Sequence, residues 1–415
     1  MNTKGDFYMQ CKKCVGRLSV FVLTGLMCGG TALAAGYQLN EYSAAGMGRA
    51  FAGAAVVGDD FSAIGYNPAG MFFNQTSGAQ LGATVVSLHS DFKGYTHAGT
   101  AWDRDHTRIT RVLPNGFVQY KLNDALTAGI GVYVPFGLAT DYKNGWFGEE
   151  HGGLSQISTT NVSPAISYRL ADTVAIGASV NFQNADARLT ATGSDVSGDD
   201  WATGYTIGMA YRPADNVRLG LSYRSAVKHN LKGRLKTAAL GNFYDISAEI
   251  TTPETIWLTG AWDVNQKWTL SGTFRWTRWS RFDTLSILSP SFSSTHPLHP
   301  AAVSVTEEKW RDTRFYALGA DYKYNDRWTF RVGTAYDSTV IRSPDYRTPR
   351  IPDGRRVWSA LGASYTWNNI QADVGYAHIF VHGGKSNGTD SNHPRPNIKY
   401  SSDANMFSFV VQYKF

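Results

Sequence analysis

The chain has 415 residues and a formal net charge of +6, and it combines 42 glycines with 12 tryptophans, 22 tyrosines and 21 phenylalanines. Few soluble domains have this composition. Outside the N-terminal region there is no block of like charge, which excludes an extended nucleic-acid footprint. No later stretch has about 18 uninterrupted apolar residues, which excludes helical membrane spans.

The N-terminal region has the order of a secretory leader, with a basic part, a short apolar run and a small-residue end. Basic residues including Lys12 and Arg17 precede an apolar run over residues 18–27, and the small residues end at Ala34. This run is too short for a membrane-spanning helix, which needs roughly 20 residues. We expect cleavage after Ala34 and a mature chain of formal charge +3, because residues 1–34 carry four basic residues and one acidic residue.

All three cysteines, Cys11, Cys14 and Cys28, fall inside the expected leader. The mature chain would therefore form no disulfide, although exported proteins often do. Its stability would then come from a closed hydrogen-bonded architecture. A lipoprotein anchored at Cys28 is the alternative, but Gly25 and Met27 fit poorly at the positions before such a cysteine.

Apolar and polar residues alternate with a period of two in several later segments, which is typical of strands with one apolar and one polar face. In the last segment the apolar residues are Phe407, Phe409, Val411, Tyr413 and Phe415. The polar faces of upstream segments carry arginines such as Arg218 and Arg275, which lipid would not tolerate. The sequence therefore predicts an all-β transmembrane antiparallel barrel with a wet lumen. A soluble sandwich would place its apolar side chains inward.

We expect fourteen strands, an even number as in other single-chain bacterial barrels. The expected ranges are 79–88, 115–122, 125–134, 162–170, 173–184, 203–212, 217–224, 255–263, 268–276, 312–323, 328–336, 357–367, 369–379 and 405–415. The connections alternate between tight turns and long polar loops, as expected for brief periplasmic turns and extended outer loops. The tight turns are expected at residues 123–124, 171–172, 213–216, 325–326 and 368–369. A soluble sandwich is not expected to have its short loops at one end and its long loops at the other.

Tryptophans cluster near the expected strand ends, where they would form girdles at the two membrane interfaces. They are Trp262, Trp268, Trp276, Trp279, Trp328, Trp358 and Trp367. Core packing in a soluble sandwich is the alternative. Phe415, which closes an alternating strand, resembles the signal read by the outer-membrane assembly machinery. That machinery, outer-membrane lipid and lipopolysaccharide are the expected partners of a monomeric barrel that binds no nucleic acid.

Residues 35–78 do not follow the strand pattern, and they are rich in alanine and glycine between positions 44 and 55. A segment without bulky side chains can pack closely against the inside of a barrel wall. We therefore expect an N-terminal hatch in the lumen, followed by the barrel over residues 79–415. A disordered periplasmic tail is the alternative.

The order of several motifs resembles the FadL family, the outer-membrane transport proteins for long-chain fatty acids and hydrocarbons. The similar stretches are AGYQLNEY at 35–42, GMGRA at 46–50, DD at 59–60, NPA at 67–69, GLAT at 137–140, YRS at 223–225, NDRWTFR at 325–331 and IPD at 351–353. They span the mature chain. The resemblance implies outer-membrane transport of hydrophobic small molecules, above all long-chain fatty acids, with aromatic hydrocarbons as the alternative ligands and with no cofactor.

The resemblance also implies a route. A ligand would come from the outer face, bind in the lumen and leave sideways through a gap at an inward kink in the third strand, where the hatch touches the wall. Pro135, Phe136, Gly137 and Leu138 follow that strand. Pro135 lacks a ladder donor and Gly137 supplies backbone freedom. An ordinary strand end before a loop is the alternative.

Asn67, Pro68 and Ala69 resemble the hatch motif beside that kink. An asparagine can hydrogen-bond backbone groups that missing ladder bonds leave free, and a proline fixes the local turn. A plain turn in a loop is the alternative.

A fatty acid in an apolar lumen needs a partner for its carboxylate, because an unpaired buried charge is costly. Lys309 and Arg311 precede the tenth strand, where the family tends to place a basic ligand contact, and Arg188 follows the fifth. Each is otherwise a solvated loop or lumen charge. The outer loop expected over residues 185–202 is shorter than in the family.

Other functions have less support in the sequence. Two histidine pairs, His296 with His299 and His378 with His382, have no third metal ligand beside them. An outer-membrane hydrolase would need a serine, a histidine and an acid in a recognisable arrangement, and none is seen. The expected plug in the lumen argues against a nonspecific porin or an adhesin.

Overall fold

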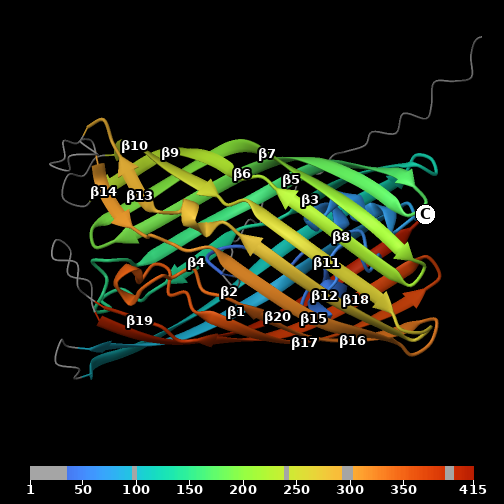
Figure 1. The fold of residues 1–415 in the computed structure, drawn as a ribbon. Coiled ribbons are helices and arrows are strands. Elements are labelled where there is room, and N and C mark those ends of the chain that lie inside the picture. Colours follow the sequence, from blue (N-terminus) through green and yellow to red (C-terminus); the bar gives the residue numbers. More distant parts are fainter. Residues whose placement is uncertain (1–34, 96–100, 238–242, 292–301, 388–396) are drawn as a thin grey trace, which may run out of the picture.

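The structure is a computed structural model that describes residues 35–95, 101–237, 243–291, 302–387 and 397–415. The expected leader and the pair of His296 and His299 lie outside these residues. The described chain forms a closed antiparallel barrel of fourteen strands (Figure 1), as the sequence predicts. In the described ranges, no helix is both long enough and apolar enough to cross a membrane.

Eight of the fourteen strands are uninterrupted in the described residues. They are β1 (Gly78–Tyr95), β2 (Ala101–Lys121), β5 (Leu154–Ala171), β6 (Val174–Ala191), β7 (Ser194–Ala214), β16 (Trp328–Asp337), β17 (Arg355–Trp367) and β20 (Asn397–Lys414). Pairing of β1 with β20, from Gly78 opposite Lys414 to Tyr95 opposite Asn397, closes the barrel.

The other six strands are each made of two segments. They are β3 (Leu126–Tyr133) with β4 (Gly137–Asp141), β8 (Val217–Arg224) with β9 (Val227–Thr237), β10 (Phe243–Thr252) with β11 (Thr255–Asp263), β12 (Trp268–Thr277) with β13 (Thr284–Leu288), β14 (Ala302–Glu307) with β15 (Thr313–Lys323), and β18 (Ile370–His382) with β19 (Lys385–Ser386). The tight turns predicted from the sequence lie at the end of the barrel that carries the C-terminus (Figure 1).

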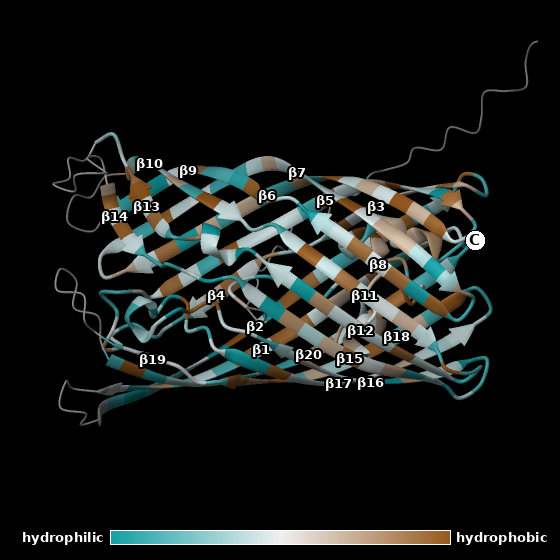
Figure 2. Cartoon of the chain, viewed as in Figure 1, coloured by the Kyte–Doolittle hydropathy of each residue, from teal (hydrophilic) through white to brown (hydrophobic). Residues whose placement is uncertain are grey.

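The period-two pattern decides which side chains face outward. Along β20 and at the residue that follows it, the alternate residues Phe407, Phe409, Val411, Tyr413 and Phe415 are 39–56% exposed on the outer surface, while Ser408 and Gln412 are fully buried inside. Arg331 of β16 likewise points inward and is buried. The alternation can be followed along the strands in Figure 2. The predicted orientation of these strands is confirmed.

The sequence analysis did not predict six short segments, β4, β9, β10, β13, β14 and β19. They extend the barrel beyond the band of apolar residues on its outer surface, which we call the apolar band. On β9 the outward residues include Lys228, Lys232 and Arg234, whereas Leu231 and Leu235 face inward and are buried. Because the outer face meets water there, the lipid-facing signal is absent. The loop expected over residues 185–202 is also wrong, since β6 and β7 form a hairpin across it.

Part of the tryptophan set faces outward, as the predicted girdles require. Trp262, Trp268, Trp328 and Trp367 are 40–58% exposed on the outer surface, and Trp276 is half-buried. Trp279 and Trp358 are instead fully buried and pack inside the barrel. Trp358 falls on the inward parity of β17, and Trp279 lies in the 3-10 helix η2 (Trp279–Arg281), where the strand alternation has ended.

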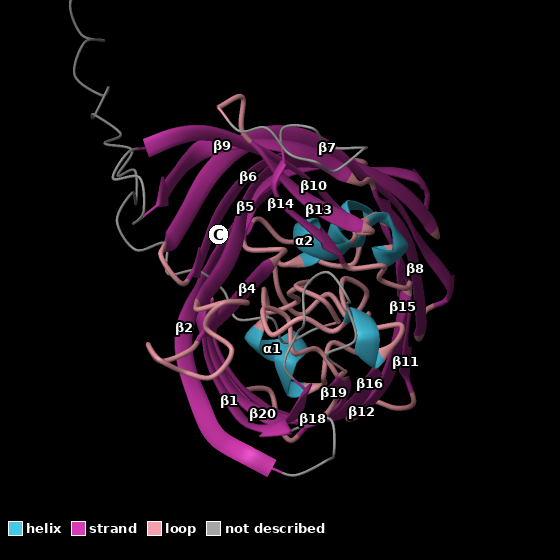
Figure 3. Ribbon diagram, turned by 90° about the vertical axis from the view of Figure 1, so that its left-hand side faces the viewer, coloured by secondary structure: helices cyan, strands magenta, loops and turns pink. Residues whose placement is uncertain are grey.

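Residues 35–77, which we call the hatch, lie inside the barrel (Figure 3). The helix α1 (Ala44–Gly48) packs against β16, β17 and β18, whereas α2 (Ala63–Tyr66) packs against β3. The 3-10 helix η1 (Pro68–Phe72) packs against β5, β6 and β7. A third short 3-10 helix, η3 (Pro344–Tyr346), lies in the β16–β17 connection. Because the strands that the hatch touches lie on different sides of the wall, the hatch spans the lumen.

The hatch and the wall approach so closely that only glycine fits at several points, of which two lie beside α1. A Cβ atom at Gly333 of β16 would lie 2.1 Å from the carbonyl carbon of Arg49, and one at Gly48 would lie 2.7 Å from the Cα atom of Gly362. Backbone therefore meets backbone where α1 is seated.

Replacing Gly333→Ala is expected to unseat the hatch, because the new methyl group would overlap backbone that has no room to retreat. Overpacking of this kind costs about 1–3 kcal/mol. Proteinase K cleavage within residues 35–77 of the purified barrel would become about tenfold faster. Gly272→Ala is the matched control, since its Cβ would lie 3.7 Å from Leu318, an ordinary contact. Equal cleavage of the two variants would contradict the expectation.

Candidate functional site

The hydrogen-bonded wall is broken beside the third strand. β5 pairs with both segments of this strand, β3 and β4. Of these two segments β2 pairs with β3 alone, from Gly116 to Lys121, and the described residues show no ladder between β2 and β4. Side-chain contacts cross there instead, from Oγ1 of Thr107 to the carbonyl oxygen of Asp141 at 2.5 Å and, just past β4, from Lys143 to Asp105 at 2.9 Å. The wall therefore opens between β2 and β4.

The hatch takes the place of β2 at the break. Gln38 forms an antiparallel bridge with Phe136. The amide of Leu39 donates to the carbonyl oxygen of Pro135 at 2.8 Å, and the amide of Gly137 donates to that of Tyr37 at 2.7 Å. Pro135 has no amide hydrogen, so no donor is left unpaired at this position. The kink is thus sealed from inside by only a few backbone bonds.

Asn67, Pro68 and Ala69 lie elsewhere on the wall. The Nδ2 atom of Asn67 donates to the carbonyl oxygens of Met209 on β7 and Leu221 on β8, at 3.1 and 3.3 Å. Its Oδ1 atom accepts from the amide of Ala69 and so caps η1, which begins at Pro68. The hydrogen bonds expected from Asn67 to the kink are made by the hatch backbone at Tyr37 and Leu39 instead.

An apolar cavity adjoins the kink on the side away from the short turns. Its free space is about 760 Å³ with the open mouth included. Its apolar lining includes Leu138, Ile157, Leu231, Ile246, Ile250, Phe282, Leu285 and Ile287. Leu138 belongs to β4 and Tyr37 of the hatch also lines the cavity, so the cavity, the hatch and the wall opening are contiguous.

Two charged side chains border this apolar cavity, Arg350 and Glu308. The Nη1 atom of Arg350 donates to Oγ of Ser155 at 2.9 Å and to the carbonyl oxygen of Thr190 at 3.1 Å. Burial lowers the pKa of Arg350, and the negative charge of Glu308 acts against this shift. A guanidinium in such surroundings can bind a carboxylate by charge-assisted hydrogen bonds.

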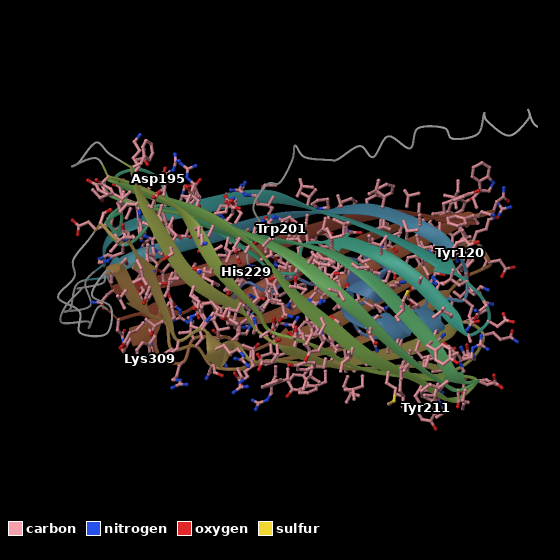
Figure 4. The ribbon with its side chains drawn as sticks, turned by 90° about the horizontal axis from the view of Figure 1, so that it is seen from above. Tyr120, Asp195, Trp201, Tyr211, His229 and Lys309 are labelled. Carbon is pink, nitrogen blue, oxygen red and sulfur yellow. The ribbon has the colours of Figure 1, made fainter. Side chains whose placement is uncertain are left out.

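The three basic residues predicted to meet a carboxylate do not line the cavity. Arg188 pairs with Asp195 at 2.7 Å with its side chain half-exposed, Lys309 pairs with Glu307 at 2.8 Å, and Nε of Arg311 donates to the Thr339 carbonyl at 3.1 Å. Lys309 and Asp195 lie at the end of the barrel opposite Tyr120 and Tyr211 (Figure 4). Arg350 was missed, although it directly precedes the IPD stretch at 351–353.

Four charged side chains, three of them buried, tie the hatch to the wall at the short-turn end. Arg49 binds Asp59 with both Nη atoms, at 2.8 and 2.9 Å, and Asp321 at 2.9 Å. Arg331 closes the ring with bonds of 2.9 Å to Asp59 and 3.2 Å to Asp321. Although burial alone would raise it, the two guanidinium groups hold the pKa of Asp59 below its usual range. The ring ties the hatch to β15 and β16.

The remaining histidine pair, His378 and His382, lies on β18. Nδ1 of His378 lies 3.0 Å from Oδ1 of Asn405. Over the ranges that the structure describes, no three histidine, cysteine, aspartate or glutamate side chains gather as a metal ion would require.

Known proteins match this chain over nearly its whole length. The sequence profile described as "Outer membrane protein transport protein (OMPP1/FadL/TodX)" matches residues 25–415. The Long-chain fatty acid transport protein of Escherichia coli K12 is 28% identical over 404 residues, covering 84% of this chain and 88% of that protein. Outer membrane protein P1 of Haemophilus influenzae is 27% identical over 419 residues, covering 87% and 89%.

Two solved structures have the same fold. A Pseudomonas aeruginosa FadL homologue has a TM-score of 0.82 at 24% identity, covering 92% of this chain and 100% of its own. The Pseudomonas putida toluene transporter TodX has a TM-score of 0.66 at 17% identity, covering 93% and 99%. With the profile match over residues 25–415, the chain belongs to the OMPP1/FadL/TodX family of outer-membrane transport proteins.

Proposed function

We propose that this protein carries hydrophobic small molecules across the outer membrane and that long-chain fatty acids are its principal ligands. The observation that carries the proposal is an apolar cavity that borders both a buried arginine and a break in the barrel wall. Membership of an outer-membrane transport family supports it. So does the similarity to a protein named for long-chain fatty acid transport.

The route runs from the outer end of the barrel to the bilayer. Buried apolar side chains on the extended strands, Leu235, Ile246 and Ile287, lead toward the cavity. A ligand in the cavity would pass Leu138 and the kink, and would leave between β2 and β4 once the bridge of Gln38 and Phe136 opens. The charge ring at the short-turn end favours this lateral exit over a straight passage.

Arg350 is the proposed partner of the fatty acid carboxylate, in place of Arg188, Lys309 and Arg311. It lies in the long β16–β17 connection, at the edge of the apolar lining, where a head group could be paired while the chain stays among apolar side chains. Such a pair offsets the cost of burying the carboxylate.

Aromatic hydrocarbons are the second candidate ligands. Most of the cavity lining is aliphatic or aromatic, so an uncharged hydrocarbon would bind there without Arg350. The structural likeness to proteins named as toluene transporters fits this alternative at the level of the fold.

Processing and assembly belong to the same proposal. The leader is removed after Ala34, residues 35–77 act as the hatch and the barrel extends from Gly78 to the C-terminus. The barrel works as a monomer, is inserted by the outer-membrane assembly machinery through its C-terminal Phe415, and contacts outer-membrane lipid and lipopolysaccharide. The outward aromatic residues of β20 support this arrangement.

Uptake in cells tests the function. A strain without this gene and its relatives is expected to take up labelled oleate several-fold more slowly than the same strain carrying the gene on a plasmid. Toluene uptake measured in parallel separates the two ligand classes. Equal uptake of both ligands with and without the gene would contradict the proposal. Large, steady, ligand-independent currents in planar bilayers would favour an open porin.

A further inference from the structure

Four basic residues form one row across four neighbouring strands. Lys93 of β1 lies directly opposite Arg104 of β2 on one side and Lys399 of β20 on the other. Lys399 in turn lies opposite Lys385 of β19. We call these four residues the basic row. It lies at the end of the barrel away from the C-terminus and the short turns, where β19 is seen in Figure 1.

The basic row points out of the barrel. Three of its members are exposed and Lys93 is half-buried. Phe92 and Ile398, each of which adjoins a member of the row along the chain, are buried and pack together inside the barrel. Because successive side chains of a strand point to opposite faces, the row belongs to the outer surface.

Like charges meet side by side in the basic row. Residues directly opposite each other on one face of a sheet have Cβ atoms about 4.5–5.5 Å apart, and like charges at such positions are destabilising. Lys93 has a basic residue on both sides. The next outward residue of β1, Asp91, is acidic, but its Oδ1 lies 3.5 Å from Nε2 of His89. The row therefore carries an electrostatic cost that a bound anion would remove.

The outward basic residues of β9 are arranged differently, because each has an acidic residue beside it. The pairs are Lys228 with Glu249 at 2.8 Å, Lys232 opposite Asp199, Arg234 opposite Asp245 and Lys236 opposite Asp195. This strand thus balances its own charges. The direct contact of cation with cation is therefore a property of the basic row and not of the outer surface in general.

The basic row stands just above the apolar band. Phe380 of β18 is 48% exposed and lies opposite Asp403, four residues along β20 from Lys399. With the usual strand rise and tilt, four residues correspond to about 10 Å along the membrane normal. Further down, the same strands present an exposed apolar row made of Phe407, Val85 and Val112. This face therefore fits an amphiphile with an anionic head group above and acyl chains below.

We propose that the basic row binds the phosphate groups of lipopolysaccharide and holds one lipid molecule on the face made by β19, β20, β1 and β2. This inference rests on the proposed contact with lipopolysaccharide and gives that contact a site and a chemistry. Lysine ammonium groups and an arginine fork form charge-assisted hydrogen bonds to phosphate oxygens. Since β2 also borders the wall opening, the lipid would be held beside the proposed exit.

Binding of lipopolysaccharide to the purified barrel, in detergent with EDTA to remove bridging cations, tests the proposal. The triple variant Lys93→Gln, Lys385→Gln, Lys399→Gln is expected to bind at least about tenfold more weakly, since each basic residue near an anionic lipid surface contributes several-fold to affinity. The matched control is Lys228→Gln, Lys232→Gln, Arg234→Gln, which loses the same charge from the balanced strand and is expected to bind as the wild type does. Equal weakening of the two variants would overturn the proposal.

The source of the phosphate is tested with two further probes. Dephosphorylated lipopolysaccharide is expected to bind the wild type as weakly as native lipopolysaccharide binds the basic-row variant. Equal affinity of the wild type for the two lipids would overturn the proposal. So would displacement of native lipopolysaccharide by millimolar inorganic phosphate, because the row would then be a site for the free anion.

Thermal unfolding of Lys93→Gln gives a readout that simple damage would not produce. Without lipid the variant is expected to unfold at or above the wild-type temperature, because repulsion by Arg104 and Lys399 is relieved. With lipopolysaccharide the wild type is expected to gain more. A lower unfolding temperature of the variant without lipid would overturn the proposal. A wild-type barrel that binds lipopolysaccharide through the row but takes up no oleate would contradict only the proposed function.

Discussion

A disulfide between Gln38→Cys and Phe136→Cys is expected to stop transport when oxidised and to restore it when reduced. The two residues are direct antiparallel bridge partners, and the flanking residues make the backbone hydrogen bonds. They therefore form a non-hydrogen-bonded pair, for which Cα atoms typically lie about 4.5 Å apart, within the range that a disulfide spans. The crosslink would fix the hatch across the proposed exit.

The expected effect is at least a tenfold fall in oleate uptake, because a ligand in the cavity would have to pass a covalently closed seal. All three native cysteines lie in residues 1–34, so cleavage after Ala34 would leave no competing thiol. Comparing oxidised and reduced states of one protein removes any effect of losing the Phe136 ring. The single variants Gln38→Cys and Phe136→Cys are the controls and should not respond to reductant. Full uptake by the crosslinked protein would exclude exit at the kink.

Replacing Arg350→Met is expected to weaken fatty-acid binding by about 10–100-fold while leaving hydrocarbon binding unchanged. Hydrogen bonds to a charged group contribute about 1.5–3 kcal/mol, and each 1.4 kcal/mol is a tenfold change in affinity. Methionine keeps much of the side-chain volume and adds an apolar group to an apolar lining. The loss should therefore be confined to ligands with a carboxylate.

Displacement of a fluorescent fatty acid by oleate and by toluene, measured on the purified barrel, checks this expectation. Arg311→Met is the matched control, because Arg311 bonds the Thr339 carbonyl and does not line the cavity. Equal oleate affinity in the wild type and Arg350→Met would show that the carboxylate is held elsewhere. Equal loss for oleate and toluene would indicate damage to the cavity and not a missing charge.

The strands within the apolar band could be read from sequence because their two faces differ. From Phe407 to Tyr413 on β20 and from Trp328 to Val332 on β16 the outward residues are apolar and most inward residues are polar, so a period of two is visible without any neighbour. The same rule failed on β9, where Lys228 and Lys232 point outward into water. It also failed at Trp279 and Trp358, whose side of the wall depends on strand parity and on where the strand ends.

The candidate site was predictable only in part. The kink residues 135–138 could be located because proline and glycine mark a break in a ladder, and the structure has the break there. The sequence did not allow us to predict which basic residue borders the cavity. Arg350 lies in a long connection between β16 and β17, and its place depends on how that connection folds back over the lumen. Arg188 and Lys309 have similar local sequences but pair with nearby acids.

By itself the sequence determined that this chain closes into a barrel with an apolar outside, since alternation along a strand is a local property that each segment carries alone. It also determined the small-residue segment that becomes the hatch. Only the tertiary structure decided that Tyr37 and Leu39, and not Asn67, bond the kink, and that Ala35 meets Asp337 across 302 residues of chain. Contacts of this kind depend on closure and on the seating of the hatch, which bring together residues whose local sequences give no sign of each other.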